Sequence, residues 1–148
     1  MPSLDQTKTL PYSAQQMYSL VMDIEKYPEF LPWCKKAKII EIISDDNLQA
    51  DLLINFKSFF EKYRSDVKHS KNAKGEYFVE VIAIEGPFKK LINKWYFRQL
   101  DNGNCEVKFF IDFEFNSFLL TKMIGSIFSR AVEKMMKAFE DRAEKEFG

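Results

Sequence analysis

The residues that could do nucleophilic or metal chemistry are few in this chain of 148 residues. They are one histidine, His69, and two cysteines, Cys34 and Cys105. A histidine can activate a cysteine as a nucleophile, but nothing in the sequence orients Cys34 toward His69. The chain also has no HExxH motif, no paired CxxC motif and no glycine-rich phosphate loop. We therefore expect no metal site, no catalytic residue and two reduced, unlinked thiols.

Three carboxylates in strand-like segments are the remaining acid–base candidates. Asp51, Glu61 and Asp112 would suit a cyclase or dehydratase if they faced a cavity. Glu61 shares the alternation of Tyr63 and Val67 and is the strongest of the three. The alternative is that all three lie on a solvated face, which is the ordinary place for strand carboxylates.

The aromatic content is high, with 15 Phe, 6 Tyr and 2 Trp. Two interpretations fit it: a large, filled core, or an apolar pocket for a flat hydrophobic ligand, since ligand cavities are mostly apolar. If there is a pocket, the candidate lining residues are Phe56, Tyr63, Val79, Trp95 and Phe113 from strands, and Met123, Ile127 and Met135 from a helix.

Two clusters of lysines stand out against a formal net charge of zero. One is Lys35, Lys36 and Lys38, and the other is Lys89, Lys90 and Lys94. Either could touch phosphates of RNA or lipid headgroups, although a plain solvated surface fits them as well. The neutral total argues against a general polyanion binder, and we expect no DNA partner.

The elements that must position these residues follow from the periodicity. Residues 3–9 form a short first strand, and a capping box of Ser13 and Gln16 starts a helix over residues 14–24. From Lys35 to Phe115 apolar and polar residues alternate with a period of two, which predicts about six strands. One of their turns is the Asn102-Gly103 pair, a strong hairpin signal.

The C-terminal segment returns to a helical period. Apolar residues step by three or four from Leu120 through Ile127 to Ala138, and Asn116 or Ser117 could cap the start. Thirty-odd residues would make one helix about 45 Å long. The pattern predicts an α+β fold in one domain, residues 1–148, with a curved antiparallel sheet of about seven strands around that helix.

The sequence also bears on location. Its longest uncharged stretch, residues 9–22, is too short for a membrane span of about 20 residues. No secretory signal is visible, so we expect a cytoplasmic protein, with peripheral contact at the inner face of the membrane as a further expectation.

Residues 21–34, VMDIEKYPEFLPWC, carry a resemblance to a known family. They are similar to a signature of the ribosome association toxin RatA and coenzyme Q-binding protein family, part of the START-like polyketide cyclase and lipid transport superfamily. The opening PYSAQQMY at residues 11–18, the Gly86-Pro87-Phe88 turn with Leu91, and Trp95 with Phe97 match more weakly. The similarity runs over nearly the whole chain.

The resemblance implies a helix-grip fold with a hydrophobic cavity between sheet and C-terminal helix, and two short helices after the first strand. It places Phe30, Leu31 and Trp33 at the mouth or lid of that cavity. It implies no catalytic residue and no cofactor beyond a bound isoprenoid lipid.

Three functions remain open from the resemblance and the residues together. The first is a non-enzymatic protein that binds ubiquinone or a similar lipid and supports respiratory electron transport as a chaperone. The second is a regulator that binds the large ribosomal subunit and blocks subunit association. The third is a cyclase or dehydratase that uses the carboxylates named above as acid–base groups.

Overall fold

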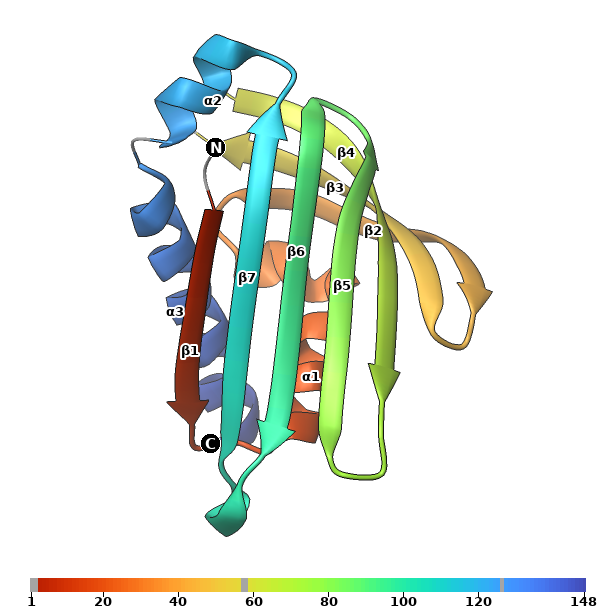
Figure 1. Cartoon of the computed structure of the whole chain (residues 1–148), viewed down its shortest axis with the longest axis vertical. Coiled ribbons are helices and arrows are strands. Elements are labelled where there is room, and N and C mark those ends of the chain that lie inside the picture. The colour runs from red at the N-terminus through yellow and green to blue at the C-terminus, as the bar shows by residue number, and fades with distance from the viewer. Residues whose placement is uncertain (1–2, 57–58, 126) are drawn as a thin grey trace.

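The computed structural model describes residues 3–56, 59–125 and 127–148, and for Phe56 and Phe59 the backbone alone. Within these residues the chain runs strand, two short helices, six strands with a 3₁₀ turn between the last two, and two helices. Figure 1 shows the strands side by side, with the helices behind them.

The N-terminal segment sets the first helices against the sheet. Strand β1 covers Ser3–Leu10, helix α1 covers Ala14–Met22, and the 3₁₀ helix η1 covers Ile24–Glu29. The predicted capping box is confirmed, because Ser13 Oγ accepts a hydrogen bond from the Gln16 backbone at 3.0 Å and Gln16 Oε1 accepts one from the Ser13 backbone at 2.9 Å. The expected helix end at Ile24 is wrong by two residues, since Asp23 leaves helical geometry.

Seven strands of the described residues form one antiparallel sheet in the order β1-β7-β6-β5-β4-β3-β2. The other six strands are β2 Cys34–Ser44, β3 Asn47–Phe56, β4 Phe59–Lys71, β5 Glu76–Glu85, β6 Phe88–Gln99 and β7 Cys105–Phe115. The predicted turn between β6 and β7 is confirmed: it holds the 3₁₀ helix η2, Asp101–Gly103, and both Asn102 and Gly103 have positive φ, 69° and 79°.

The C-terminal helix is two helices rather than the single long one that we expected. Helix α2 covers Phe118–Gly125, and α3 covers Phe128–Phe147. Ile127 precedes α3 with φ −119° and ψ 6°, outside helical geometry. Gly125 ends α2, and glycine stabilises a helix least of the residues other than proline, so a break here costs little. The 20 residues of α3 span about 30 Å.

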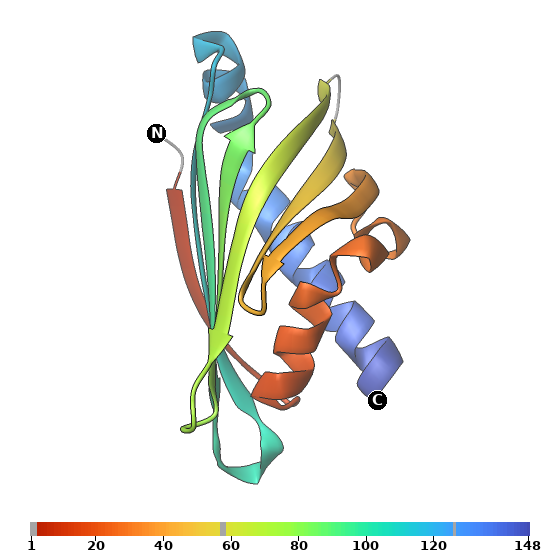
Figure 2. The same ribbon diagram turned by 90° about the vertical axis from the view of Figure 1, so that its right-hand side faces the viewer.

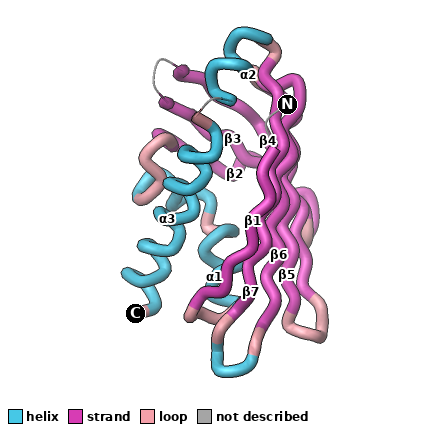
Figure 3. The backbone as a smooth tube through the Cα atoms, turned by 60° about the vertical axis from the view of Figure 1, so that its left-hand side comes forward, coloured by secondary structure: helices cyan, strands magenta, loops and turns pink. Residues whose placement is uncertain are grey.

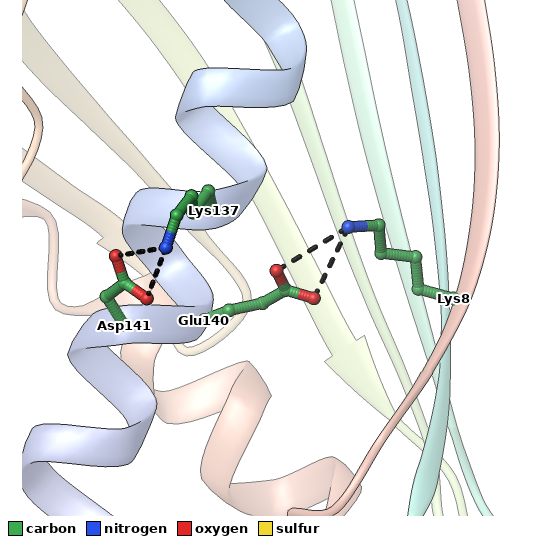
Figure 4. Close-up of polar contacts among 4 residues, drawn as sticks. All are labelled: Lys8, Lys137, Glu140 and Asp141. Carbon is green, nitrogen blue, oxygen red and sulfur yellow. Dashed lines mark hydrogen bonds and ion pairs between the residues drawn. The ribbon is translucent and has the colours of Figure 1, made fainter.

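The sheet curves around α3, which crosses its concave face (Figure 2), and helices and sheet form two layers (Figure 3). An ion pair joins the layers at one edge, where Lys8 Nζ on β1 lies 3.4 Å from Glu140 Oε1 on α3 (Figure 4). Along β7 every second side chain turns toward the concave face. On β7 the buried residues are Cys105, Val107, Phe109, Phe113 and Phe115, as the alternation predicts.

Candidate functional site: an apolar cavity between sheet and helix

The space between the concave face and α3 is not completely filled. A cavity of about 190 Å³ lies there, lined by residues of β3 to β7 and of both C-terminal helices. Phe88, Phe109 and Phe115 belong to its sheet side, and Ile124, Phe128 and Met135 to its helix side. None of the described lining residues is charged. Both interpretations of the aromatic content therefore hold in part: the rings pack on one another and also enclose a cavity.

A smaller cavity of about 70 Å³ lies beside the first, toward α1 and η1. The two share five lining residues: Trp33, Tyr63, Val81, Asn93 and Met135. The smaller cavity carries more polar groups, because Tyr27 and Ser65 also line it. Side by side, the two offer an apolar space and a narrower, more polar one.

Several polar groups of the smaller cavity form hydrogen bonds within the protein. The Tyr27 hydroxyl donates to the Val21 carbonyl of α1, and the Ser65 hydroxyl donates to the Ala50 carbonyl of β3 at 3.4 Å. The Asn93 side chain donates from Nδ2 to the Phe110 carbonyl at 3.0 Å, and its Oδ1 accepts from Trp95 Nε1 at 3.0 Å. These bonds fix the orientation of each group.

The structure brings six of the predicted site residues to the two cavities. Trp33, Tyr63, Phe113 and Met135 line the larger one, and Leu31 and Trp95 line the smaller one. Trp33 is half-buried and Ile124 is half-buried. Other lining residues, such as Ile54 and Phe88, are half-buried as well. Trp33 belongs to the turn before β2 and Ile124 to α2, and we call the side of the larger cavity between these two segments its mouth.

The other predicted site residues lie elsewhere. Val79 is buried in the core without lining either cavity. Phe30 packs outward against Phe139 at 5.1 Å, beneath the Arg142 guanidinium at 5.1 Å. Met123 is 57% exposed on α2, and Ile127 lies at the junction before α3. The Phe56 side chain lies outside the described residues.

Sequence reasoning missed several lining residues. Phe109 and Phe115 share the β7 alternation with Phe113, and Asn93 shares the β6 alternation with Trp95, so the signal was present. Phe128 was missed for a different reason. A continuous helix puts Ile127 on the inward stripe, whereas the break turns Phe128 inward instead.

The acid–base candidates lie away from the cavities. Glu61 is exposed. Asp112 lies on the outer face of β7, with Oδ2 2.7 Å from Lys90 Nζ on β6. Asp51 pairs with Arg64 at 2.8 Å. Within the described residues, neither cavity is lined by a carboxylate, so none of these three candidates faces a ligand held there.

The cysteine and histidine candidates do not form a pair either. Cys34 and Cys105 are both buried and free, as we expected. Burial raises the pKa of each thiol to about 11, so neither supplies a thiolate at neutral pH. His69 Nδ1 instead lies 2.6 Å from the Tyr18 hydroxyl of α1. In the part of the chain that the structure describes, no cluster of three metal-ligating side chains occurs.

The two lysine clusters differ in their surroundings. Lys89, Lys90 and Lys94 pair with Glu114, Asp112 and Glu80 at 3.6, 2.7 and 3.9 Å on the outer face of the sheet. Lys35, Lys36 and Lys38 are exposed and make no ion pair with any described residue. They follow Trp33 and Cys34 in the chain. Among the described residues, no ion pair neutralises the charge of this cluster.

Comparison with known proteins identifies sequences that are similar to this chain. The family model for polyketide cyclase / dehydrase and lipid transport matches residues 10–140. The chain is 44% identical over 145 residues to the ribosome association toxin RatA of Rickettsia prowazekii, covering 97% of each chain. It is 30% identical to the mitochondrial coenzyme Q-binding protein COQ10 of Dictyostelium discoideum, covering 97% of this chain and 70% of that one.

The fold is shared with a wider group. The crystal structure of the Zhui aromatase/cyclase from Streptomyces sp. R1128 matches with a TM-score of 0.82 and 15% identity, covering 97% of this chain and 94% of that one. At this identity the likeness establishes the architecture alone, and it confirms the sheet wrapped around a C-terminal helix. No described helix has the length and apolar character to cross a membrane.

Proposed function

The chain belongs to the polyketide cyclase / dehydrase and lipid transport family, and from this premise we propose that it binds an isoprenoid quinone such as ubiquinone. The quinone lies between the sheet and α3, and the protein carries it for respiratory electron transport without converting it. The observation that carries this proposal is the cavity itself, about 190 Å³ and free of charged residues in its described lining. A relative of similar sequence is named as a coenzyme Q-binding protein.

The size of the cavity favours a ligand that is only partly enclosed. Pockets that bury a whole small molecule usually measure about 300–1,000 Å³. At about 190 and 70 Å³, the two cavities together suit a ring and the start of a chain. A long isoprenoid tail would leave through the mouth, along α2.

Helix α2 has the character of a docking element at that mouth. None of its described residues is buried, and Phe118 and Leu119 are 81% and 77% exposed. Lys122 on the same helix is exposed, and so are Lys35 and Lys36 at the start of β2. Exposed apolar groups next to free lysines suit the surface of an anionic bilayer, so the quinone would pass between membrane and cavity without crossing water.

A cavity-filling substitution tests the binding site. Ala131 lines the larger cavity from α3, and Ala131→Phe would occupy the space that the quinone needs. We expect its Kd for decylubiquinone, measured by quenching of tryptophan fluorescence, to rise at least tenfold. Glu133→Phe, at an exposed position on the same helix, is the matched control and keeps the wild-type Kd. Equal affinity of both variants and wild type would contradict the proposal.

A second candidate, association with the ribosome, is favoured by the name of the 44% identical relative and by the unpaired cluster Lys35, Lys36 and Lys38. Contacts between lysines and RNA phosphates weaken steeply with salt, because binding releases counterions. The test is co-sedimentation with large ribosomal subunits at low and moderate salt. Replacing the three lysines by Glu abolishes it, whereas the same change at Lys89, Lys90 and Lys94 does not. No co-sedimentation of the wild type at low salt would exclude this candidate.

A further inference from the structure

Tyr63 is one of the five residues that line both cavities. It does so from the inner face of β4 and is 8% exposed. Its ring packs edge-on against Phe88, with centroids 5.1 Å apart. The turn at Gly86 also lies so close that a side chain there would come within 2.7 Å of Tyr63 Cβ. The residue is therefore held rigidly.

The hydroxyl of Tyr63 differs from the other hydroxyls of the site. Those of Tyr27 and Ser65 donate to backbone carbonyls. No described residue forms a hydrogen bond with the Tyr63 hydroxyl. The hydroxyl oxygen is not one of the fully buried polar atoms that lack a partner, so part of its surface borders open space in the site. The donor is therefore available to a molecule that enters the cavities.

The chemistry of the surroundings limits what the partner can be. Burial raises the pKa of Tyr63 well above its usual value, so the group stays protonated and can donate at any physiological pH. No described residue lining either cavity is cationic, so a carboxylate or phosphate would be buried without a counter-charge, which is costly. A neutral ligand with an accepting oxygen fits.

We infer that the Tyr63 hydroxyl donates a hydrogen bond to a carbonyl or ether oxygen of a neutral ring-bearing ligand. The oxygen-bearing ring then lies where the two cavities meet, and the apolar chain points through the larger cavity toward α2. This inference rests on the proposed function and gives it an orientation and a selectivity, for neutral oxygenated rings over plain hydrocarbons and over anionic lipids.

The test compares two probes on two variants by calorimetry. The probes are decylubiquinone and decylbenzene, which keeps the ring and chain but has no oxygen. Tyr63→Phe should weaken decylubiquinone binding about tenfold, the size of one neutral hydrogen bond, and leave decylbenzene binding within about twofold. Tyr96→Phe, whose hydroxyl donates to Glu76 and which lines neither cavity, should keep the wild-type ratio between the probes.

Thermal unfolding provides a second readout. Ligand-free Tyr63→Phe should unfold at the wild-type temperature or above, because no described protein bond is lost, whereas Tyr27→Phe should unfold at a lower temperature. If Tyr63→Phe weakens the binding of both probes equally, or of neither, the inference is wrong. Quinone binding by the wild type would not be affected by that result. Failure of the wild type to bind decylubiquinone would overturn the proposed function, and this inference with it.

Discussion

The rings of Phe113 and Phe128 stack with centroids 4.8 Å apart and 9° between their planes, which joins β7 to the first turn of α3. Both residues also line the larger cavity. The stack therefore has two roles, because it closes the sheet against the helix and forms part of the binding surface.

Removing one ring of that stack should cost stability. We expect Phe128→Ala to lower the free energy of unfolding by about 3–5 kcal/mol, as is usual for a buried phenylalanine. Urea unfolding measures this. Phe118→Ala, at an exposed position on α2, should change the free energy by no more than about 0.5 kcal/mol. A similarly small effect of Phe128→Ala would show that the stack of Phe128 on Phe113 does not stabilise the fold.

The segment before β2 contains two aromatic residues, Trp33 and Phe30, that contact different parts of the molecule. We therefore expect their substitutions to affect ligand binding differently. Trp33 lines both cavities, and Trp33→Ala should weaken decylubiquinone binding about tenfold, the loss expected for one buried aromatic contact of about 1.4 kcal/mol. Because Trp33 is only half-buried, the variant should still unfold cooperatively.

Phe30→Ala is the control for that experiment, since Phe30 packs on the outside of α3. It should leave the quinone affinity within about twofold, less than 0.5 kcal/mol. Calorimetry on both variants measures the difference. A folded Trp33→Ala protein with wild-type affinity would place the ligand elsewhere.

Docking through α2 predicts a loss of membrane binding without a loss of fold. Replacing Phe118 and Leu119 by Ser should abolish co-flotation with vesicles that contain anionic phospholipid, because both side chains are exposed and apolar. The control is Ile42→Ser on β2, at the hairpin that lies on the other side of the molecule in Figure 1. If both proteins float equally well, α2 is not the docking element.

The ion pair of Asp51 and Arg64 predicts a pH dependence of stability. The Arg64 hydrogen bond, 2.8 Å from Nε to Oδ1, lowers the pKa of Asp51 in the folded state below its ordinary value. A carboxylate with a lowered folded pKa stabilises the protein above its unfolded pKa of about 3.9. That contribution disappears as the pH falls through the folded pKa.

Arg64→Gln should therefore be less stable than wild type at pH 7 and lose less stability between pH 5 and pH 3. Urea unfolding across this range measures both effects. Lys68→Gln, at an exposed lysine without an ion pair to any described residue, should follow the wild-type curve. The same pH dependence in Arg64→Gln as in wild type would mean that the pair contributes nothing.

The fold could be predicted to a large extent because its signals are local. The alternation of Val107, Phe109 and Phe113 needs only a strand with one buried face, and Asn102-Gly103 needs only a tight turn. The break before Phe128 could not be predicted, because the apolar spacing continues through it. It depends on tertiary packing, in which Phe128 gains the stack on Phe113.

The candidate site could be predicted only in part. The resemblance and the strand alternation pointed to Trp33, Tyr63 and Phe113, but alternation alone does not separate a residue that lines a cavity from one that fills the core, as Val79 does. Whether a residue lines a cavity or fills the core depends on where the side chains of the sheet and of the helices leave space between them. The free hydroxyl of Tyr63 is likewise a property of its neighbours, since it follows from the absence of an acceptor among the described residues around it.

The most direct test of quinone binding is native mass spectrometry, with lipid extraction, on the protein purified from its own host. We expect an isoprenoid quinone to co-purify in near-stoichiometric amount, and Ala131→Phe to co-purify with much less. A protein that arrives empty and takes up no added quinone would contradict the account, and co-sedimentation with ribosomal subunits would then decide on the second candidate.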